Sequence, residues 1–302
     1  MPRKYPKIVQ MGSKNTRDMG VDGIRIDEKV DGSCLIMSRG FYGKMEFFNK
    51  KGQPAPSLFN KPIEYLKSME RHIPAGYTYF MEILNKPKHN QICYDRVPKN
   101  GIYLFDVYDQ ISEAYFPMGE DVDAMARDYL DVSGPNVLFE TVFAISYSEV
   151  VEHAQAFIGE ESFLGGHAIE GVVIKDYSLS HYNGKLEWPL TVAKIVSDEF
   201  REVMGQKHQK VKADPFREFF KTFCTEARWN KAVQHLEEEG SLLYEDSDIG
   251  SIIKEVHMDI EEEELEYIQK QLMNIAMKPL KKTAVEGLAH WYKDKLVNRE
   301  IG

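Results

Sequence analysis

The chain has 302 residues, three cysteines and a net charge of −10 at neutral pH. It contains no uninterrupted apolar run of about 18 residues and no apolar signal segment near Met1, which argues against a membrane-spanning or secreted protein and predicts a cytoplasmic one. The cysteines, Cys34, Cys93 and Cys224, are too widely separated for a disulfide framework or a zinc knuckle.

The negative charge is unevenly distributed along the chain. From residue 213 onward, 12 Lys and Arg stand against 19 Asp and Glu, whereas the first 212 residues are nearly balanced. Lys and Arg supply most of the affinity for nucleic-acid phosphates. Any phosphate-binding surface is therefore expected to be local, formed by clusters such as Lys50-Lys51 and residues 207–212.

Up to about residue 200, short β-branched and aromatic runs alternate with turn residues, which predicts strands. They are expected at 24–27, 34–38, 44–49, 77–83, 102–108, 171–175 and 190–196. Helices are expected at 61–72, 122–130 and 148–159, the last after a capping box at Ser146 to Glu149. This pattern predicts an α+β domain of antiparallel sheets with flanking helices.

Beyond residue 200 the apolar residues recur at helical spacing. The recurring positions are Phe216, Phe219, Phe220 and Phe223, then Leu265, Ile268, Leu272 and Ile275. Pro215 suits the first turn of a new helix. We therefore expect two domains, residues 1–212 and a small all-α domain at 213–302.

The segment from Glu28 to Ser33, Glu-Lys-Val-Asp-Gly-Ser, lies between two strand-like runs. A purely structural interpretation is a hairpin that turns at Asp-Gly. Lys-x-Asp-Gly alone would occur by chance in roughly one chain in fourteen of this length. The segment gains meaning from later parts of the chain, where charged or aromatic residues recur within or beside apolar strands, at Glu82, Phe105-Asp106, Glu170 and Lys194. Burying an unpaired charge is costly, so these groups need partners or a ligand.

In order and approximate spacing, these residues resemble the motifs of the covalent nucleotidyltransferases, which include ATP-dependent DNA ligases, RNA ligases and mRNA-capping guanylyltransferases. The resemblance covers about residues 5 to 200 and implies a nucleotidyltransferase (ATP-grasp-like ligase) domain. It implies that Lys29 is the nucleophile that carries AMP, Glu82 binds the ribose, Phe105 stacks on the base, Glu170 binds the metal and Lys194 contacts the α-phosphate.

Three further residues are added to the nucleotide site. Glu28 precedes the nucleophile. Lys50 stands where the family usually has an arginine, so a planar bidentate donor is lost and recognition of nucleic-acid ends is weakened. Lys175 is either a phosphate contact or a surface lysine at the end of its strand. The last motif of many RNA ligases has two lysines that flank one residue, but Val192 occupies the first of these positions.

The chemistry of the site is consistent with these roles. A lysine that attacks the α-phosphate of ATP must be neutral, whereas a free lysine has a pKa near 10.4. We therefore expect a site that favours the uncharged amine through a metal cation and other lysines. Mg²⁺, with Mn²⁺ as the alternative, suits separated glutamates combined with phosphate oxygens. No histidine pair has metal-ligand spacing, and His89, His153, His167 and His181 are expected on the surface or in loops.

The helical tail distinguishes an RNA ligase from the DNA ligases and capping enzymes that share these motifs. DNA ligases and capping enzymes of this superfamily have a strand-rich barrel after the last motif, so an ATP-dependent RNA ligase of the phage type is favoured. It would join 5′-phosphate and 3′-hydroxyl RNA ends in RNA repair, as a monomer, with DNA ends as a further substrate. A non-catalytic nucleic-acid-binding relative is the alternative from another class. We expect the tail not to supply the nucleotide pocket.

Overall fold

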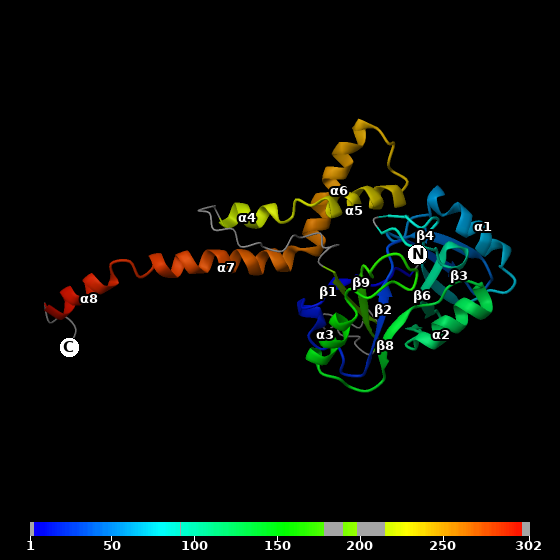
Figure 1. The fold of residues 1–302 in the computed structure, drawn as a ribbon, viewed down its shortest axis with the longest axis horizontal. Coiled ribbons are helices and arrows are strands. Elements are labelled where there is room, and N and C mark those ends of the chain that lie inside the picture. Colours follow the sequence, from blue (N-terminus) through cyan, green and yellow to red (C-terminus); the bar gives the residue numbers. More distant parts are fainter. Residues whose placement is uncertain (1–2, 91, 178–189, 198–214, 298–302) are drawn as a thin grey trace.

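The computed structural model describes residues 3–90, 92–177, 190–197 and 215–297. Two five-stranded sheets form the body, and helices follow them along the chain (Figure 1). The basic cluster at 207–212, His181 and the domain boundary expected near residue 212 lie outside the described residues.

The first sheet has the strand order β1-β10-β9-β2-β8. Its strands are β1 (Val9–Gln10), β2 (Ile24–Lys29), β8 (Val137–Thr141), β9 (Gly171–Asp176) and β10 (Thr191–Val196). All pairings are antiparallel except that β1 runs parallel to β10. The expected antiparallel sheets are therefore present, and the parallel pairing of β1 with β10 is an addition at this edge, where two residues of the amino-terminal segment form a short strand.

The second sheet has the order β4-β3-β5-β6-β7 and is antiparallel throughout. Its strands are β3 (Ser33–Arg39), β4 (Met45–Asn49), β5 (Tyr77–Ile83), β6 (Ile102–Asp109) and β7 (Ala114–Tyr115). The seven strands expected from the sequence are all present, and β1, β7 and β8 are additional.

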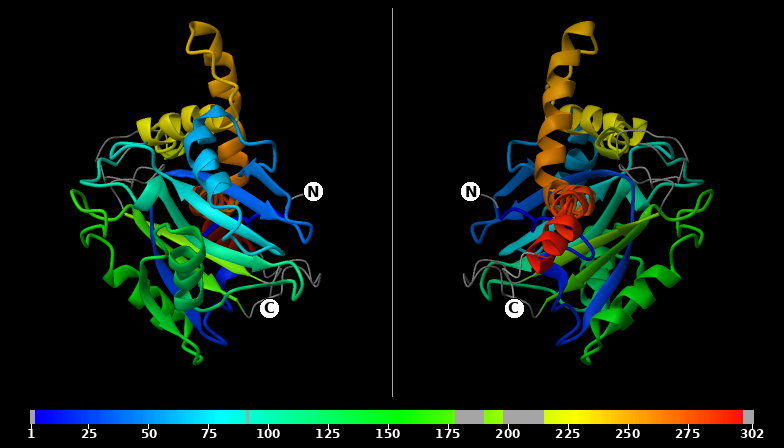
Figure 2. Two further views of the ribbon diagram at one scale, coloured as in Figure 1. Left: turned by 90° about the vertical axis from the view of Figure 1, so that its right-hand side faces the viewer. Right: turned by 90° about the vertical axis from the view of Figure 1, so that its left-hand side faces the viewer.

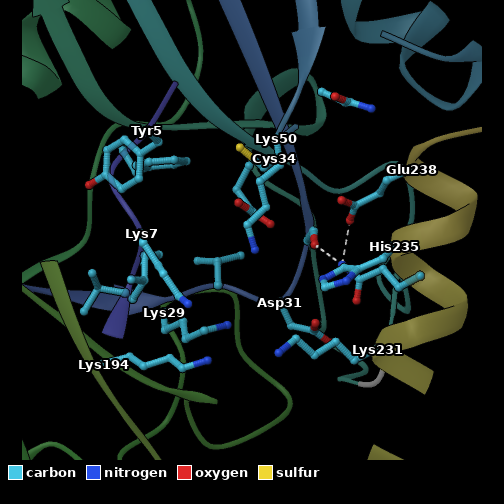
Figure 3. A pocket seen from close by; sticks show the side chains of 18 of the residues that line it. Tyr5, Lys7, Lys29, Asp31, Cys34, Lys50, Lys194, Lys231, His235 and Glu238 are labelled. Carbon is cyan, nitrogen blue, oxygen red and sulfur yellow. Dashed lines mark hydrogen bonds between the residues drawn. The ribbon is translucent and has the colours of Figure 1, made fainter. Parts of the chain in front are cut away.

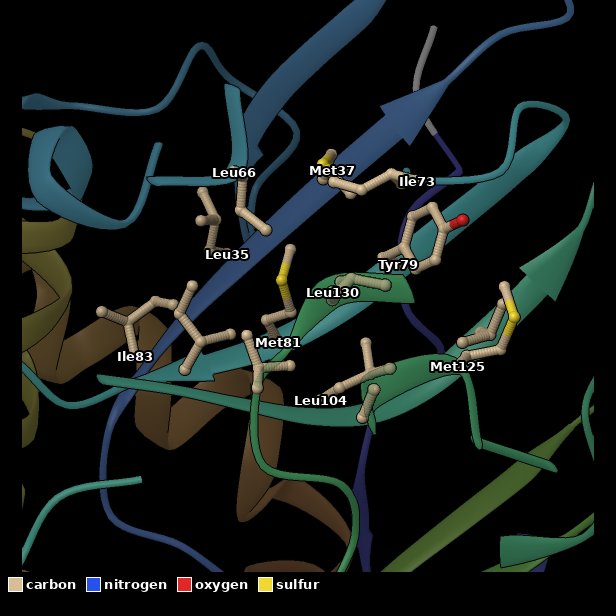
Figure 4. Close-up of a cluster of buried hydrophobic side chains, with 14 of the residues drawn as sticks. Leu35, Met37, Leu66, Ile73, Tyr79, Met81, Ile83, Leu104, Met125 and Leu130 are labelled. Atoms are coloured by element: carbon tan, nitrogen blue, oxygen red, sulfur yellow. The ribbon is translucent and has the colours of Figure 1, made fainter. Parts of the chain in front are cut away.

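Strand residues alternate between the two faces of a sheet. The apolar side chains on the outer face of each sheet pack against helices. Leu35, Met37, Tyr79 and Met81 pack beneath α1 (Asn60–Ser68) and α2 (Gly119–Ala124), as Figure 4 shows for the sheet residues. Ile24, Ile26 and Ile174 pack beneath α3 (Tyr147–Ala156), which begins at the expected capping box.

The helix expected at 122–130 starts earlier and continues from α2 into a π-helical segment, η4 (Met125–Leu130). Short 3-10 turns lie at η1 (Lys14–Thr16), η2 (Ser57–Phe59), η3 (Lys99–Gly101) and η5 (Asp246–Asp248).

The tail is helical, as the apolar spacing predicts. Its helices are α4 (Pro215–Lys221), α5 (Glu226–Glu238), α6 (Ile249–Glu263), α7 (Leu265–Thr283) and α8 (Leu288–Val297). Helices α5 and α6 lie beside the two sheets, whereas α7 and α8 extend away from them (Figures 1 and 2). Within the described ranges, no helix is long and apolar enough to cross a membrane.

A buried ionic network joins the inner faces of the two sheets. Arg25 and Asp27 come from β2, Lys175 from β9 and Asp106 from β6. Arg25 lies 3.0 Å from Asp27 and 3.1 Å from Asp106, and the Lys175 ammonium lies 2.7 Å from Asp27 and 2.8 Å from Asp106. All four side chains are at most 2% exposed. Although burial alone raises the pKa of Asp106, Lys175 and Arg25 bring it below its usual value.

A β-bulge in β6 provides a further acceptor for this network. Phe80 pairs with Asp106 and Met81 with Leu104, so Phe105 is the extra residue on its strand. Its carbonyl is released from the sheet ladder and accepts hydrogen bonds of 2.9 Å from both Arg25 and Lys175. Two cations and two anions, together with this carbonyl, thus pair with one another while almost fully buried.

We predict that Lys175→Met destabilises the protein by about 3–5 kcal/mol, because it leaves two buried aspartates with one cation. Urea unfolding without nucleotide measures the change. Lys44→Met is the control, since Lys44 pairs with Glu46 on the surface and its loss should cost less than about 0.5 kcal/mol. A loss below about 1 kcal/mol for Lys175→Met would show that the network does not hold the sheets together.

Candidate active site

A cavity of about 550 Å³ lies between the inner faces of the sheets and is closed on one side by α5 and α6 (Figure 3). Strand alternation places the predicted residues on its wall: Lys29 and Lys194 from the first sheet, Glu82 and Phe105 from the second. Glu170, just before β9, joins them. Glu28, Lys50 and Lys175 also border the cavity, so all eight residues predicted for the site border the same space.

Lys29 ends β2 and is paired with Glu170. Its ammonium lies 2.6 Å from both carboxylate oxygens, and its side chain is 23% exposed. Burial alone lowers the pKa of Lys29, but Glu170, with smaller contributions from Asp31 and Glu82, raises it above its ordinary value. The protein groups alone therefore favour the charged amine. The expected neutral amine depends on a metal cation beside Lys29 and stays a prediction.

The turn after Lys29 is fixed by the segment that precedes β6. Asp31 accepts hydrogen bonds from the Ile92 amide at 2.8 Å and the Asn90 amide group at 3.3 Å. Gly32 lies against β5, where a Cβ atom would meet the Glu82 Cγ at 2.7 Å. Glycine is thus required here for close approach, which brings Glu82 directly beside the Lys29 turn.

Glu82 faces a second carboxylate, Glu238, contributed by α5. Burial and then Glu238 raise the pKa of Glu82 to about 8, although Lys29 and Lys50 act in the opposite direction. The pKa of Glu238 is also raised, chiefly by burial. A carboxyl group that keeps its proton near neutral pH can donate a hydrogen bond as well as accept one. Such a group suits a ribose hydroxyl, the contact expected of Glu82.

Phe105 presents its ring to the cavity from the β6 bulge. The Tyr5 ring meets it edge-on with centroids 5.1 Å apart, and the Phe80 ring lies 6.4 Å away. Tyr5 itself borders the cavity and donates its hydroxyl to Asp106. An aromatic wall of this kind can accept a flat base by stacking.

Lys175 is not a surface lysine, since the residue is 1% exposed. Its ammonium has three hydrogens, and Asp27, Asp106 and the Phe105 carbonyl take all three. The geometry therefore gives it a structural role beneath the nucleotide site and leaves no hydrogen for a phosphate.

Glu28 is similarly engaged. It accepts hydrogen bonds from Ser162, the Phe163 amide and Asn136 at 2.5, 3.1 and 2.8 Å. These contacts fasten the loop before Glu170 to β2, which positions Glu170 for Lys29. A direct contact between Glu28 and the nucleotide stays a prediction.

The helical tail supplies part of the cavity, so the expectation that it stands apart from the nucleotide pocket is wrong. Gln234 of α5 donates to the Gly32 carbonyl at 2.9 Å, and Glu263 of α6 pairs with Lys194 at 3.0 Å. Lys51 pairs with Glu239 and lies 3.6 Å from Glu255. Sequence reasoning missed these tail residues because the helices carry no motif. The one available signal was Val192, which stands where many RNA ligases have a second lysine and so leaves Lys194 without that neighbour.

In the described part of the chain, histidines and cysteines do not build a metal centre. His89 hydrogen-bonds Ser33 at 3.0 Å, His153 stacks on Phe139 at 4.0 Å and His235 pairs with Glu255 at 2.8 Å. Of the histidines expected on the surface or in loops, His89 and His167 lie in loops, whereas His153 lies in α3, and all three are half-buried. Among the residues that the structure describes, no group of three or more His, Cys, Asp or Glu side chains is placed to hold a metal ion. The donor set fits only an ion that takes Glu170 and oxygens from a bound phosphate, as Mg²⁺ does.

No protein-family model and no curated protein sequence matches the chain. Among solved structures, it is similar to a Naegleria gruberi RNA ligase mutant with ATP and Mn, at 14% identity and a TM-score of 0.48, over 66% of this chain and 57% of that one. It is also similar to an archaeal ATP-dependent RNA ligase, at 18% identity and a TM-score of 0.46, over 84% of this chain and 62% of that one. The match thus spans less than two thirds of either ligase.

We predict that Glu82→Gln becomes more stable relative to the wild type as pH rises. Between about pH 4.5 and 8 the folded protein keeps a proton on Glu82 that the unfolded chain releases, so wild-type stability falls through this window. Glutamine removes this loss, and the difference in free energy of unfolding should grow by about 1–3 kcal/mol between pH 5 and pH 9. Urea unfolding at several pH values measures it, with the exposed Glu64→Gln as control. A difference that does not change with pH would contradict the shifted pKa.

Proposed function

We propose that this protein is an ATP-dependent RNA ligase that works through AMP joined covalently to Lys29. One observation carries the proposal: residues from five separate segments, chosen by their order in the sequence, border a single cavity. These are Lys29, Glu82, Phe105, Glu170 and Lys194. A chance Lys-x-Asp-Gly turn would have no reason to lie beside the other four.

The chemistry begins with the release of Lys29 from Glu170. The lysine ammonium passes a proton to solvent, and the neutral amine attacks the α-phosphorus of ATP. A nitrogen–phosphorus bond forms as the bond to the bridging oxygen breaks, pyrophosphate leaves, and the nitrogen gives a second proton to solvent. A bound Mg²⁺ or Mn²⁺ would neutralise phosphate charge and draw Glu170 away from the lysine. Lys194, 7% exposed, would stabilise charge that develops on the α-phosphate. AMP then passes to a 5′-phosphate end, and a 3′-hydroxyl displaces it as the phosphodiester forms.

The tail favours RNA ligation over the alternatives from the same superfamily. From residue 215 to residue 297 the chain is built of helices and loops without a strand, unlike the barrel that the resemblance implies for DNA ligases and capping enzymes. Incubation with labelled ATP or GTP, followed by tests of RNA and DNA ends, separates these functions. Labelling by GTP would indicate capping, and no labelling by either nucleotide would indicate a non-catalytic relative.

Lys29→Ala should abolish the covalent AMP adduct and leave the protein folded, because the proposed nucleophile ends a strand at the cavity and is not part of a hydrophobic core. Intact-mass and peptide mass spectrometry measure the adduct. Lys4→Ala, at the exposed rim of the same cavity, is the control and should keep it. An AMP adduct mapped to any other lysine of the wild type would falsify the assignment.

Glu170→Ala and Lys194→Ala should each slow adenylation by about 100-fold or more, the usual effect of losing one group that stabilises charge in a transition state. Rapid-quench assays with labelled ATP measure the rate, and circular dichroism checks that the variants fold. Near wild-type rates in either variant would mean that the motifs have been placed on the wrong strands.

A further inference from the structure

A carboxylate of the tail lies between two lysines at the edge of the cavity. One oxygen of Glu263, at the end of α6, lies 3.0 Å from the Lys194 ammonium and 2.9 Å from that of Lys231 in α5. Lys231 also lies 2.5 Å from Asp259. The side chains of Lys194, Lys231 and Glu263 are 9%, 14% and 16% exposed, so this is not a solvated surface pair.

The two lysines are directed at the space where a nucleotide would react. Lys29, Lys194 and Lys231 come from β2, β10 and α5, and in Figure 3 their ammonium groups point into the same part of the cavity. Burial alone raises the pKa of Glu263, but Lys194 and Lys231 bring it well below its usual value, so the carboxylate is ionised. An anionic oxygen held by two ammonium groups is the arrangement that a phosphate oxygen would adopt.

The tail does not need Glu263 to hold its own helices together. Arg228 of α5 is buried and pairs with Asp259 of α6 and with Glu264, which follows it. Lys51 ties the second sheet to α5 and α6 at a separate place on the cavity wall. Glu263 instead pairs with Lys194, which is a predicted phosphate ligand.

We infer that Lys194 and Lys231 form a phosphate-binding subsite that Glu263 fills when no ligand is bound, and that a phosphate group displaces this carboxylate. The inference rests on the proposed function and extends it, because it gives the helical tail a direct ligand to the substrate. The phosphate has two sources with the same chemistry: the outer phosphates of a nucleoside triphosphate or the 5′-phosphate of an RNA end. An ionised Glu263 and a phosphate would repel each other, so binding must move Glu263 away from the lysines.

The test is a set of binding measurements on the full chain by isothermal titration calorimetry. The probes are α,β-methylene ATP, which cannot release pyrophosphate, AMP, and one RNA oligonucleotide with either a 5′-phosphate or a 5′-hydroxyl. Glu263→Gln, which removes the competing charge, should tighten binding of the phosphate probe by about fivefold or more. Lys231→Met should weaken it by about tenfold, and Lys231→Arg should restore most of the loss. Lys221→Met, which removes a surface pair with Glu218 within tail helix α4 and lies away from the cavity, should change it by less than about twofold.

The probes identify the source of the phosphate. If Lys231→Met weakens α,β-methylene ATP but not AMP, the subsite takes the outer nucleotide phosphates. If it weakens the 5′-phosphate RNA but not its 5′-hydroxyl form, the subsite takes the RNA end. Binding of every probe unchanged by Lys231→Met, or weakened by Glu263→Gln, would overturn the inference and leave the pair as a tail anchor. The AMP adduct on wild-type Lys29 is measured separately, so a missing adduct with intact phosphate binding would count against the proposed function alone.

Discussion

The arrangement of the site depends on the ionic network between the sheets. Arg25, Asp27, Lys175 and Asp106 neutralise one another while at most 2% exposed, and removing any one of them leaves an uncompensated charge. The strands that carry this network also carry Lys29 and Phe105, and β9 begins directly after Glu170. Cavity residues from opposite sheets are therefore held at a fixed separation, as the proposed binding of a nucleotide between them would require.

Lysines and carboxylates border the cavity together, and three of the lysines are already paired. Glu170 holds Lys29, and Glu263 holds Lys194 and Lys231. Under the proposed function, these lysines would give a chain with a net charge of −10 a local site for a polyanion. The tail contributes much of the excess negative charge, and part of it lines the cavity. Overall charge is thus a poor guide to the ligand, because the local arrangement compensates it.

The strands and the residues bordering the cavity could be predicted because each has a local signal. An apolar run broken by a single charge marks both a strand and a position that needs a partner, as at Glu82 and Lys194. The role of Lys175 could not be read in this way, since its partners Asp27 and Asp106 lie about 148 and 69 positions away. The positions of Lys231, Glu238 and Glu263 at the cavity could not be predicted either. Helix periodicity indicates which face of a helix is buried but not what that face packs against.

The bulge at Phe105 limits which insertions and deletions β6 can accept without moving its side chains to the other face of the sheet. Before it, Ile102 and Leu104 face the helices, and after it Val107 does, so the extra residue reverses which positions of β6 point inward. Deleting Phe105 would restore a regular ladder with Asp106 still opposite Phe80, but it would remove the released carbonyl and the ring that borders the cavity. Deleting a residue on either side of the bulge would instead turn the side chains beyond the deletion to the opposite face. The bulge therefore decides which side chains of β6 reach the cavity and which reach the helices.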